Sequence, residues 1–223
     1  MTPAQLREQM AIVVGEFVPV AVEQVASWVR GEGALPERAM AVTFDDGYVD
    51  VHDEAAPILA GFGIPGAAFV SPEFSDRAGS VPGVGYEALR PIMGWSEVRA
   101  LRRSGWTIGS HALTHARLSG LPEIALRAEL ASSRDRLRQG LGSDVTVLAY
   151  PYGTPGAVSL RVRDVARESG YQAAFMAVTG APIQGQDPFA IPRAKVLGSD
   201  SRRVFRASVE GALDLWRLVE SSH

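Results

Sequence analysis

Short apolar runs alternate along this chain with longer segments in which apolar residues recur every three or four positions. The apolar runs predict strands at residues 39–42, 64–70, 106–109, 145–149, 172–178 and 189–193. The helical spacing predicts two helices within residues 4–30 and further helices at about 49–61, 95–105, 122–139, 158–169 and 201–219. Because strands and helices alternate, we expect an α/β protein with a parallel sheet or barrel.

One long segment interrupts this alternation. Residues 71–94 are rich in serine, glycine and proline and have few apolar periods. We expect them to run over the mouth of the fold, because long loops in compact domains are more often functional than idle. The chain has 223 residues, of which 46% are hydrophobic, so it can bury one sizeable core. We therefore predict a single domain over residues 1–223.

The composition excludes several kinds of site. A net charge of -3 without a dense block of lysine and arginine argues against nucleic acid as a partner. The absence of cysteine removes thiolate zinc sites, disulfides and cysteine nucleophiles. The first residues lack a basic region followed by a long apolar stretch, so we predict no signal peptide, no membrane span and a cytoplasmic location. The sequence does not specify an oligomeric state.

Two adjacent carboxylates, Asp45 and Asp46, follow the first strong apolar run. The end of a parallel strand is where ligands and catalytic groups collect in α/β folds. An Asp-Gly turn of a hairpin is the alternative, although the residues after Tyr48 resemble a helix rather than a second strand. Two ionised carboxylates in a dry site repel each other, so a cation is expected to neutralise one and leave the other as a base.

A pair of histidines could supply the other ligands of such a cation. His111 and His115 lie four residues apart, directly after another predicted strand. This spacing on a helical turn places two imidazoles on one side, which suits a zinc ion. Two unrelated polar histidines are the alternative. Two histidines and one carboxylate form a catalytic metal set with open positions for water and substrate.

Three motifs in this order resemble those of the polysaccharide deacetylases, the NodB-homology or carbohydrate esterase family 4 enzymes. They are Thr43-Phe44-Asp45-Asp46-Gly47-Tyr48, Ser110-His111-Ala112-Leu113-Thr114-His115 and Tyr150-Pro151-Tyr152-Gly153. The resemblance covers about residues 35–200. It implies a distorted (β/α) barrel of mostly parallel strands and metal-dependent removal of an acetyl group from an N-acetylated sugar or glycan.

The resemblance also implies a role for each matching residue. Asp46, His111 and His115 would hold the ion, usually Zn²⁺. Asp45 would be the general base, and the backbone N–H of Tyr152 would help to stabilise the oxyanion. The substrate groove would be walled by Tyr48, Pro151 and Tyr152.

Three departures from the family pattern affect these expectations. Ala112 stands where many members have serine or threonine, so a bond that steadies the loop is missing or replaced. Ala149 stands where an arginine often orients the base, and Arg193 is either its replacement or a structural arginine. The late histidine that protonates the leaving amine has no counterpart, because only His223 follows His115. Asp45 could return its own proton to the nitrogen.

The predicted activity is therefore metal-dependent deacetylation of an N-acetylated amino sugar. One alternative is hydrolysis of a non-sugar C–N bond in a small cyclic amide or ureide. Another is a sugar-binding relative with little catalysis, which the missing late histidine suggests.

Overall fold

A five-stranded parallel sheet forms the centre of the computed structural model, which describes residues 1–77 and 90–211. The strand order is β3-β4-β5-β6-β7, so each strand pairs with its neighbour in sequence. Their bounds are β3 Val42–Phe44, β4 Gly66–Val70, β5 Thr107–Ser110, β6 Val147–Ala149 and β7 Ala173–Phe175. A second, two-stranded parallel sheet pairs β1 (Val18–Pro19) with β2 (Ala39–Met40).

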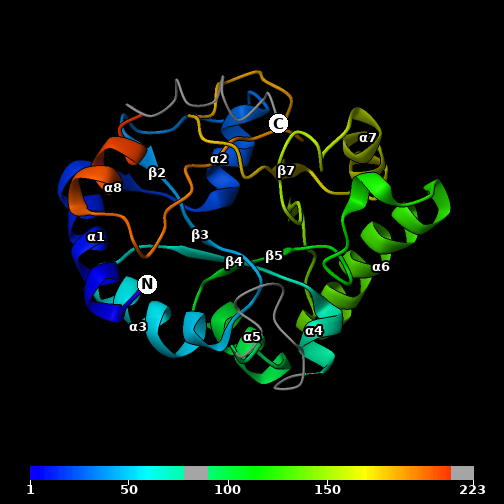
Figure 1. Cartoon of the computed structure of the whole chain (residues 1–223), viewed down its shortest axis with the longest axis horizontal. Coiled ribbons are helices and arrows are strands. Elements are labelled where there is room, and N and C mark those ends of the chain that lie inside the picture. Colours follow the sequence, from blue (N-terminus) through cyan, green and yellow to red (C-terminus); the bar gives the residue numbers. More distant parts are fainter. Residues whose placement is uncertain (78–89, 212–223) are drawn as a thin grey trace.

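Helices connect these strands and surround the sheet (Figure 1). They are α1 Pro3–Glu16, α2 Val22–Val29, α3 Ala56–Gly61, α4 Pro72–Asp76, α5 Trp95–Arg103, α6 Glu123–Leu141, α7 Leu160–Glu168 and α8 Arg202–Val209. A π-helix at Val51–Ala55 precedes α3, and a 3₁₀ turn covers Leu118–Gly120. The sheet curls into a half barrel, which confirms the predicted distorted (β/α) barrel with parallel strands.

Both faces of the sheet are buried, as expected for parallel strands between helices. Along β4, Ala67 and Phe69 pack in one cluster with the apolar side of α2. The alternate residues Ala68 and Val70 pack in another cluster with α1, α3 and α5. Leu148 on β6 joins a third cluster with α6 and α7. The period of two therefore distributes the strand residues between α2 on one face and the surrounding helices on the other.

Several predicted elements differ from the observed ones. The run at 39–42 is divided between β2 and β3, because the chain leaves its pairing with β1 and joins β4. Residues 189–193 do not form the predicted strand and contribute only a bridge between Phe175 and Ile191. Part of the excursion at 71–94 is the helix α4, while 78–89 lies outside the described residues. The predicted last helix is observed over Arg202–Val209, and the part predicted beyond residue 211 lies outside the described residues as well.

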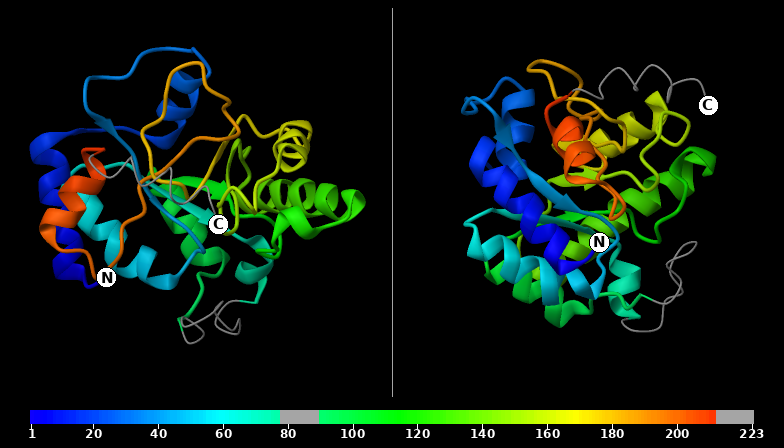
Figure 2. Two further views of the ribbon diagram at one scale, coloured as in Figure 1. Left: turned by 45° about the horizontal axis from the view of Figure 1, so that its top comes forward. Right: turned by 60° about the vertical axis from the view of Figure 1, so that its left-hand side comes forward.

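The ends of the described chain meet beside β3. Helix α8 lies next to α1 (Figures 1 and 2). Gln5 on α1 donates a hydrogen bond from Nε2 to the carbonyl oxygen of Gly198, 3.1 Å away. An ion pair joins Arg206 on α8 to Glu16 at the end of α1. These contacts place two helices at the open edge of the half barrel.

Candidate metal centre and active site

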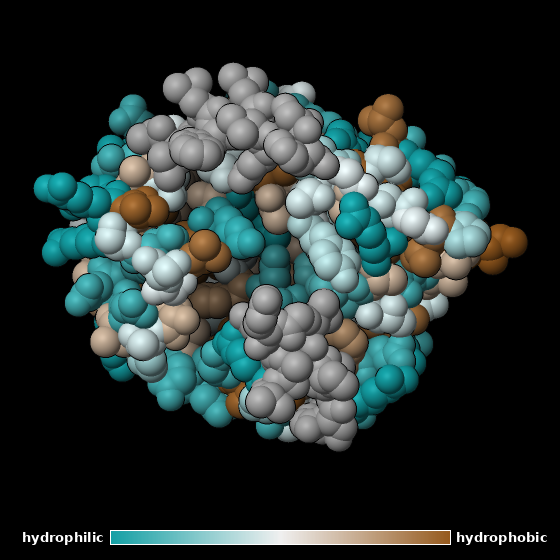
Figure 3. All heavy atoms as spheres, viewed as in Figure 1, coloured by the Kyte–Doolittle hydropathy of each residue, from teal (hydrophilic) through white to brown (hydrophobic). Residues whose placement is uncertain are grey.

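The three sequence motifs converge at the carboxyl ends of the parallel strands. Asp45 follows β3, His111 follows β5 and Tyr150 follows β6. The molecular surface has a hollow near the middle of the face shown in Figure 3, and hydrophilic residues lie within this hollow. This is the edge of an α/β sheet where binding sites usually form.

Asp46, His111 and His115 form a cluster that could hold a metal ion. The Oδ1 atom of Asp46 lies 3.3 Å from His111 Nε2 and 3.2 Å from His115 Nε2. At the bond lengths of zinc sites, two ligands of a tetrahedral ion lie about 3.3–3.4 Å apart. The separations, together with two imidazoles and one carboxylate, therefore fit a catalytic divalent metal.

The environment of His111 orients its ring for ligation. The side chain is 3% exposed, and its Nδ1 lies 2.7 Å from the backbone carbonyl oxygen of Ala149. A carbonyl can only accept, so Nδ1 carries the proton and donates. In the neutral ring that a metal requires, the lone pair is on Nε2; in the charged ring, Nε2 instead donates to Asp46, which it faces. The bond that Nδ1 donates is of the kind usual for histidine ligands of metals.

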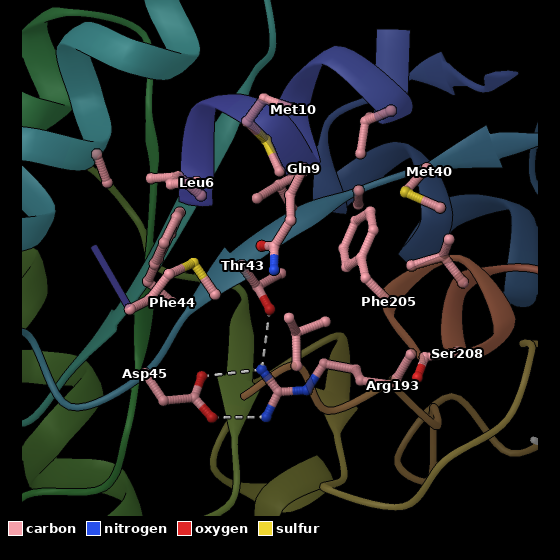
Figure 4. A pocket seen from close by; sticks show the side chains of 18 of the residues that line it. Leu6, Gln9, Met10, Met40, Thr43, Phe44, Asp45, Arg193, Phe205 and Ser208 are labelled. Carbon is pink, nitrogen blue, oxygen red and sulfur yellow. Dashed lines mark hydrogen bonds and ion pairs between the residues drawn. The ribbon is translucent and has the colours of Figure 1, made fainter. Parts of the chain in front are cut away.

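Asp45 is held by Arg193 through two hydrogen bonds. Nη1 and Nη2 of the guanidinium donate to the two carboxylate oxygens of Asp45, each at 2.8 Å (Figure 4). Nη1 also donates to Thr43 Oγ1 at 3.2 Å, and Nε donates to the backbone oxygen of Met176 at 2.9 Å. Arg193 thus fixes the orientation of Asp45 while it is itself fixed from two sides.

The charges at the site keep both carboxylates ionised. Burial acts to raise the pKa of Asp45, but the charge and hydrogen bonds of Arg193 outweigh it and hold that pKa below its ordinary value. Burial likewise opposes ionisation of Asp46, yet hydrogen bonds from His111 and His115 bring its pKa well below the usual range. Burial acts to lower the pKa of His111, and the bond to Asp46 with the nearby carboxylate charges raises it. The cluster therefore favours a positive charge.

The residues expected to wall a substrate groove differ in exposure. Tyr152 is 45% exposed, and its ring centroid lies 5.2 Å from that of His115. Its backbone N–H has no hydrogen-bond partner in residues 1–77 and 90–211, so it is available to a ligand. Pro151 is buried. Tyr48 is 8% exposed, and the guanidinium of Arg90 lies 4.1 Å from its ring centroid.

Other residues support the histidine loop and were not singled out from the sequence. Glu129 on α6 accepts hydrogen bonds from the backbone N–H and the hydroxyl of Thr114, at 2.6 and 2.9 Å. The hydroxyl of Ser110 accepts from the backbone N–H of Ala112 at 3.2 Å and lies 2.8 Å from Ser133 Oγ. These bonds steady the loop at the position where Ala112 has no side-chain hydroxyl.

A family model described as polysaccharide deacetylase matches residues 32–174, which is more than half of the chain. The chain therefore belongs to the polysaccharide deacetylase family.

Two curated relatives and one solved structure illustrate the similarity. YxkH of Bacillus subtilis is 26% identical over 174 residues, covering 78% of this chain and 57% of that protein. The poly-β-1,6-N-acetyl-D-glucosamine N-deacetylase of Escherichia coli K12 is 27% identical over 236 residues, covering 92% of this chain and 34% of that protein. This chain thus spans only part of the length of both relatives.

The solved structure is the Streptococcus pyogenes deacetylase PplD in complex with acetate. It superposes with a TM-score of 0.78 at 17% identity, covering 93% of this chain and 86% of that one. The two proteins share a fold. Among the residues described here, no helix is both long and apolar enough to cross a membrane.

Proposed function

We propose that this chain is a metal-dependent deacetylase that removes the acetyl group from an N-acetylated amino sugar in a glycan. The observation that carries the proposal is Asp45, which adjoins the three-ligand cluster and is held in one orientation by Arg193. Family membership supports deacetylation of a sugar. Because the E. coli relative is a poly-β-1,6-N-acetyl-D-glucosamine N-deacetylase, that glycan is the first to test.

The residues of the site divide the chemistry between them. Asp46, His111 and His115 would hold the ion, and this donor set suits Zn²⁺. When bound, such an ion polarises the amide carbonyl and makes water more acidic. Asp45 accepts a proton from the attacking water. The backbone N–H of Tyr152 donates to the carbonyl oxygen as it becomes negative.

The departing nitrogen must also receive a proton. In the described part of the chain, His52 is the histidine that lies outside the metal cluster. It is on the π-helix, and its Nδ1 lies 2.7 Å from Asp53 Oδ1, so its partner is a carboxylate outside the site. We therefore assign the return of the proton to Asp45, which gains one when water attacks. One carboxylate then serves as base and as acid in turn.

Acetate release from a panel of N-acetylated sugars tests this function. The panel runs from N-acetylglucosamine to its β-1,6- and β-1,4-linked oligomers, each with added zinc or with a chelator. We expect release that requires the metal and that falls about 10²–10⁴-fold in Asp45→Asn, because that variant lacks the base. Zinc binding by Asp45→Asn is measured in parallel, since this residue is outside the proposed ligand set.

Asp53→Asn is the matched control, because this exposed carboxylate lies eight positions further on and outside the site. It should retain full activity. No release from any sugar by zinc-loaded protein would overturn the sugar-deacetylase proposal. Small cyclic amides and ureides would then be tested, and tight sugar binding without turnover of any amide would indicate a binding protein.

A further inference from the structure

A cavity of about 830 Å³ adjoins Asp45. This volume is far larger than an acetyl group needs. The walls of the cavity come from α1, α2, the π-helix and α8, from the strands β2, β3 and β7, and from residues 180–182 and 191–198. It includes Asp45 and Asp46 but neither His111 nor His115, so it extends from the carboxylate side of the metal cluster. Its volume is in the range of sites that bind small molecules.

The wall of this cavity is largely apolar. Figure 4 shows the polar groups of Thr43, Asp45 and Arg193 together, with apolar side chains from α1, α8 and the strands around the remaining space. Large apolar residues in the wall include Leu6, Met10, Met40, Phe44, Phe175 and Phe205, and polar ones include Gln9, Asp50, Glu54 and Arg90. The apolar part of the wall would take water from sugar hydroxyls without bonding them, whereas an alkyl chain carries no such cost.

Gln9 indicates that the cavity is occupied in solution. This side chain on α1 is 7% exposed, and its amide points into the cavity toward Thr43 (Figure 4). It has no hydrogen-bond partner within residues 1–77 and 90–211. By contrast, Gln5 on the same helix bonds to Gly198. Buried amides are nearly always paired, so ordered water is expected beside Gln9, and an alkyl chain would occupy the apolar part of the cavity that remains.

We propose that this cavity receives the acyl chain of the substrate, and that the enzyme therefore removes acyl groups longer than acetyl from N-acylated amino sugars. The proposal rests on the proposed function, because it places the scissile amide at Asp45 and the chain beyond it. Water adds its hydroxyl to the acyl carbon and a proton to the nitrogen as the C–N bond breaks. The products are a fatty acid and a free amine.

The test compares N-acetyl, N-butyryl, N-hexanoyl and N-octanoyl glucosamine with the full chain and zinc. We expect kcat/KM to rise about fourfold for each added methylene until the cavity is filled. Ser208→Phe should reduce the ratio of octanoyl to acetyl activity, because Ser208 lies in the cavity wall on α8 and is 7% exposed. Val204→Phe is the control, since Val204 on the same helix is 43% exposed and outside the wall.

Calorimetry with octanoate and acetate provides a second measurement that needs no turnover. Octanoate should bind more tightly than acetate, and Ser208→Phe should remove that difference. Rates and affinities that do not increase with chain length, with acetate still released, would overturn this proposal and leave the proposed function intact. They would indicate another occupant of the cavity, such as residues 212–223 or a second copy of the chain. Tighter octanoate binding without hydrolysis of any N-acyl sugar would instead refute the proposed function and support the acyl cavity.

Discussion

The backbone at the site adopts a conformation that side chains normally disfavour. Asp46, Ala112, His115 and Tyr152 have φ angles between 61° and 71°. Such left-handed residues typically cost about 1–3 kcal/mol each and persist only where the surroundings hold them. The sequence predicted the ligand types from their spacing. It could not predict these angles, because nothing in alanine or tyrosine favours them.

The partner of Asp45 also shows what one sequence can and cannot reveal. The position of Arg193 after a predicted strand left two alternatives open, an orienting residue or a structural one. Arg193 contacts Asp45 across 148 positions of the chain, and local patterns carry no information about such a distance. The structure shows that Arg193 contacts Asp45. The effect of this contact on the reaction remains a prediction.

We expect Arg193→Met to lower kcat by about 10–100-fold while zinc binding is retained, because Asp45 loses its fixed orientation. The pKa of Asp45 should also rise in this variant, since burial then acts without the opposing charge of Arg193. A base with a raised pKa is protonated at a higher pH, so the acidic limb of the kcat/KM profile should move to higher pH. Profiles of kcat/KM against pH for both proteins provide the measurement.

The control for this variant is Arg138→Met, which removes an exposed guanidinium that pairs with Asp135 on α6. It should leave both rate and profile unchanged. An acidic limb that stays in place or moves to lower pH in Arg193→Met would contradict the assigned electrostatic role.

At the scale of elements, two differences between prediction and structure arise from local hydrogen bonding. Pro57 has no N–H to continue the helix that begins near Val51, and a π-helix precedes α3 at this point. The pairing that Ile191 begins with β7 is not extended into a strand, because the N–H of Arg193 donates to the carbonyl of Val178 instead of continuing the ladder with Met176. Apolar runs and helical spacing locate elements well, but single residues such as Pro57 and Arg193 decide where their hydrogen bonds stop.

Helix α6 supports the histidine loop through polar residues on its buried side. Its buried positions are Leu126, Glu129, Leu130, Ser133 and Leu137, which recur at helical spacing. A glutamate and a serine therefore occupy places in an apolar stripe. This was a signal available in the sequence, because buried carboxylates are rarely left without a partner.

We expect Glu129→Ala to weaken zinc binding by about 10–100-fold, because Thr114 loses the acceptor that fixes the loop between His111 and His115. Glu129→Gln should recover part of this loss, since its amide oxygen can still accept. Competition with a chromophoric chelator measures the affinity. Glu123→Ala on the exposed side of the same helix should bind zinc normally. Equal affinities for all these variants would show that α6 does not position the ligands.

For the molecule as a whole, the sequence predicted a barrel but not how its open edge is closed. Helices α1 and α8 meet there, although they lie at opposite ends of the described chain. Their contacts include the Arg206–Glu16 ion pair and the Gln5–Gly198 hydrogen bond. The cavity between them arises from this packing, and no local pattern indicates a space between distant segments.

Phe205 is the large apolar side chain by which α8 is anchored. It is 3% exposed, and the other buried residue of this helix is Ser208. Val209 packs against the same cluster as Phe205 while only partly buried, and Val204 is 43% exposed. The apolar contribution of α8 to closure therefore rests mainly on one aromatic ring.

We expect Phe205→Ala to lower the free energy of unfolding by about 3 kcal/mol, the lower end for a buried phenylalanine, because its ring already borders a cavity. Urea denaturation measures this loss, and faster amide exchange in residues 202–209 would localise it. Val204→Ala on the same helix should change stability by less than about 0.5 kcal/mol. If both variants lost equally little stability, the Phe205 ring would not be what holds α8. Closure of the half barrel would then depend on the polar bonds between α8 and α1.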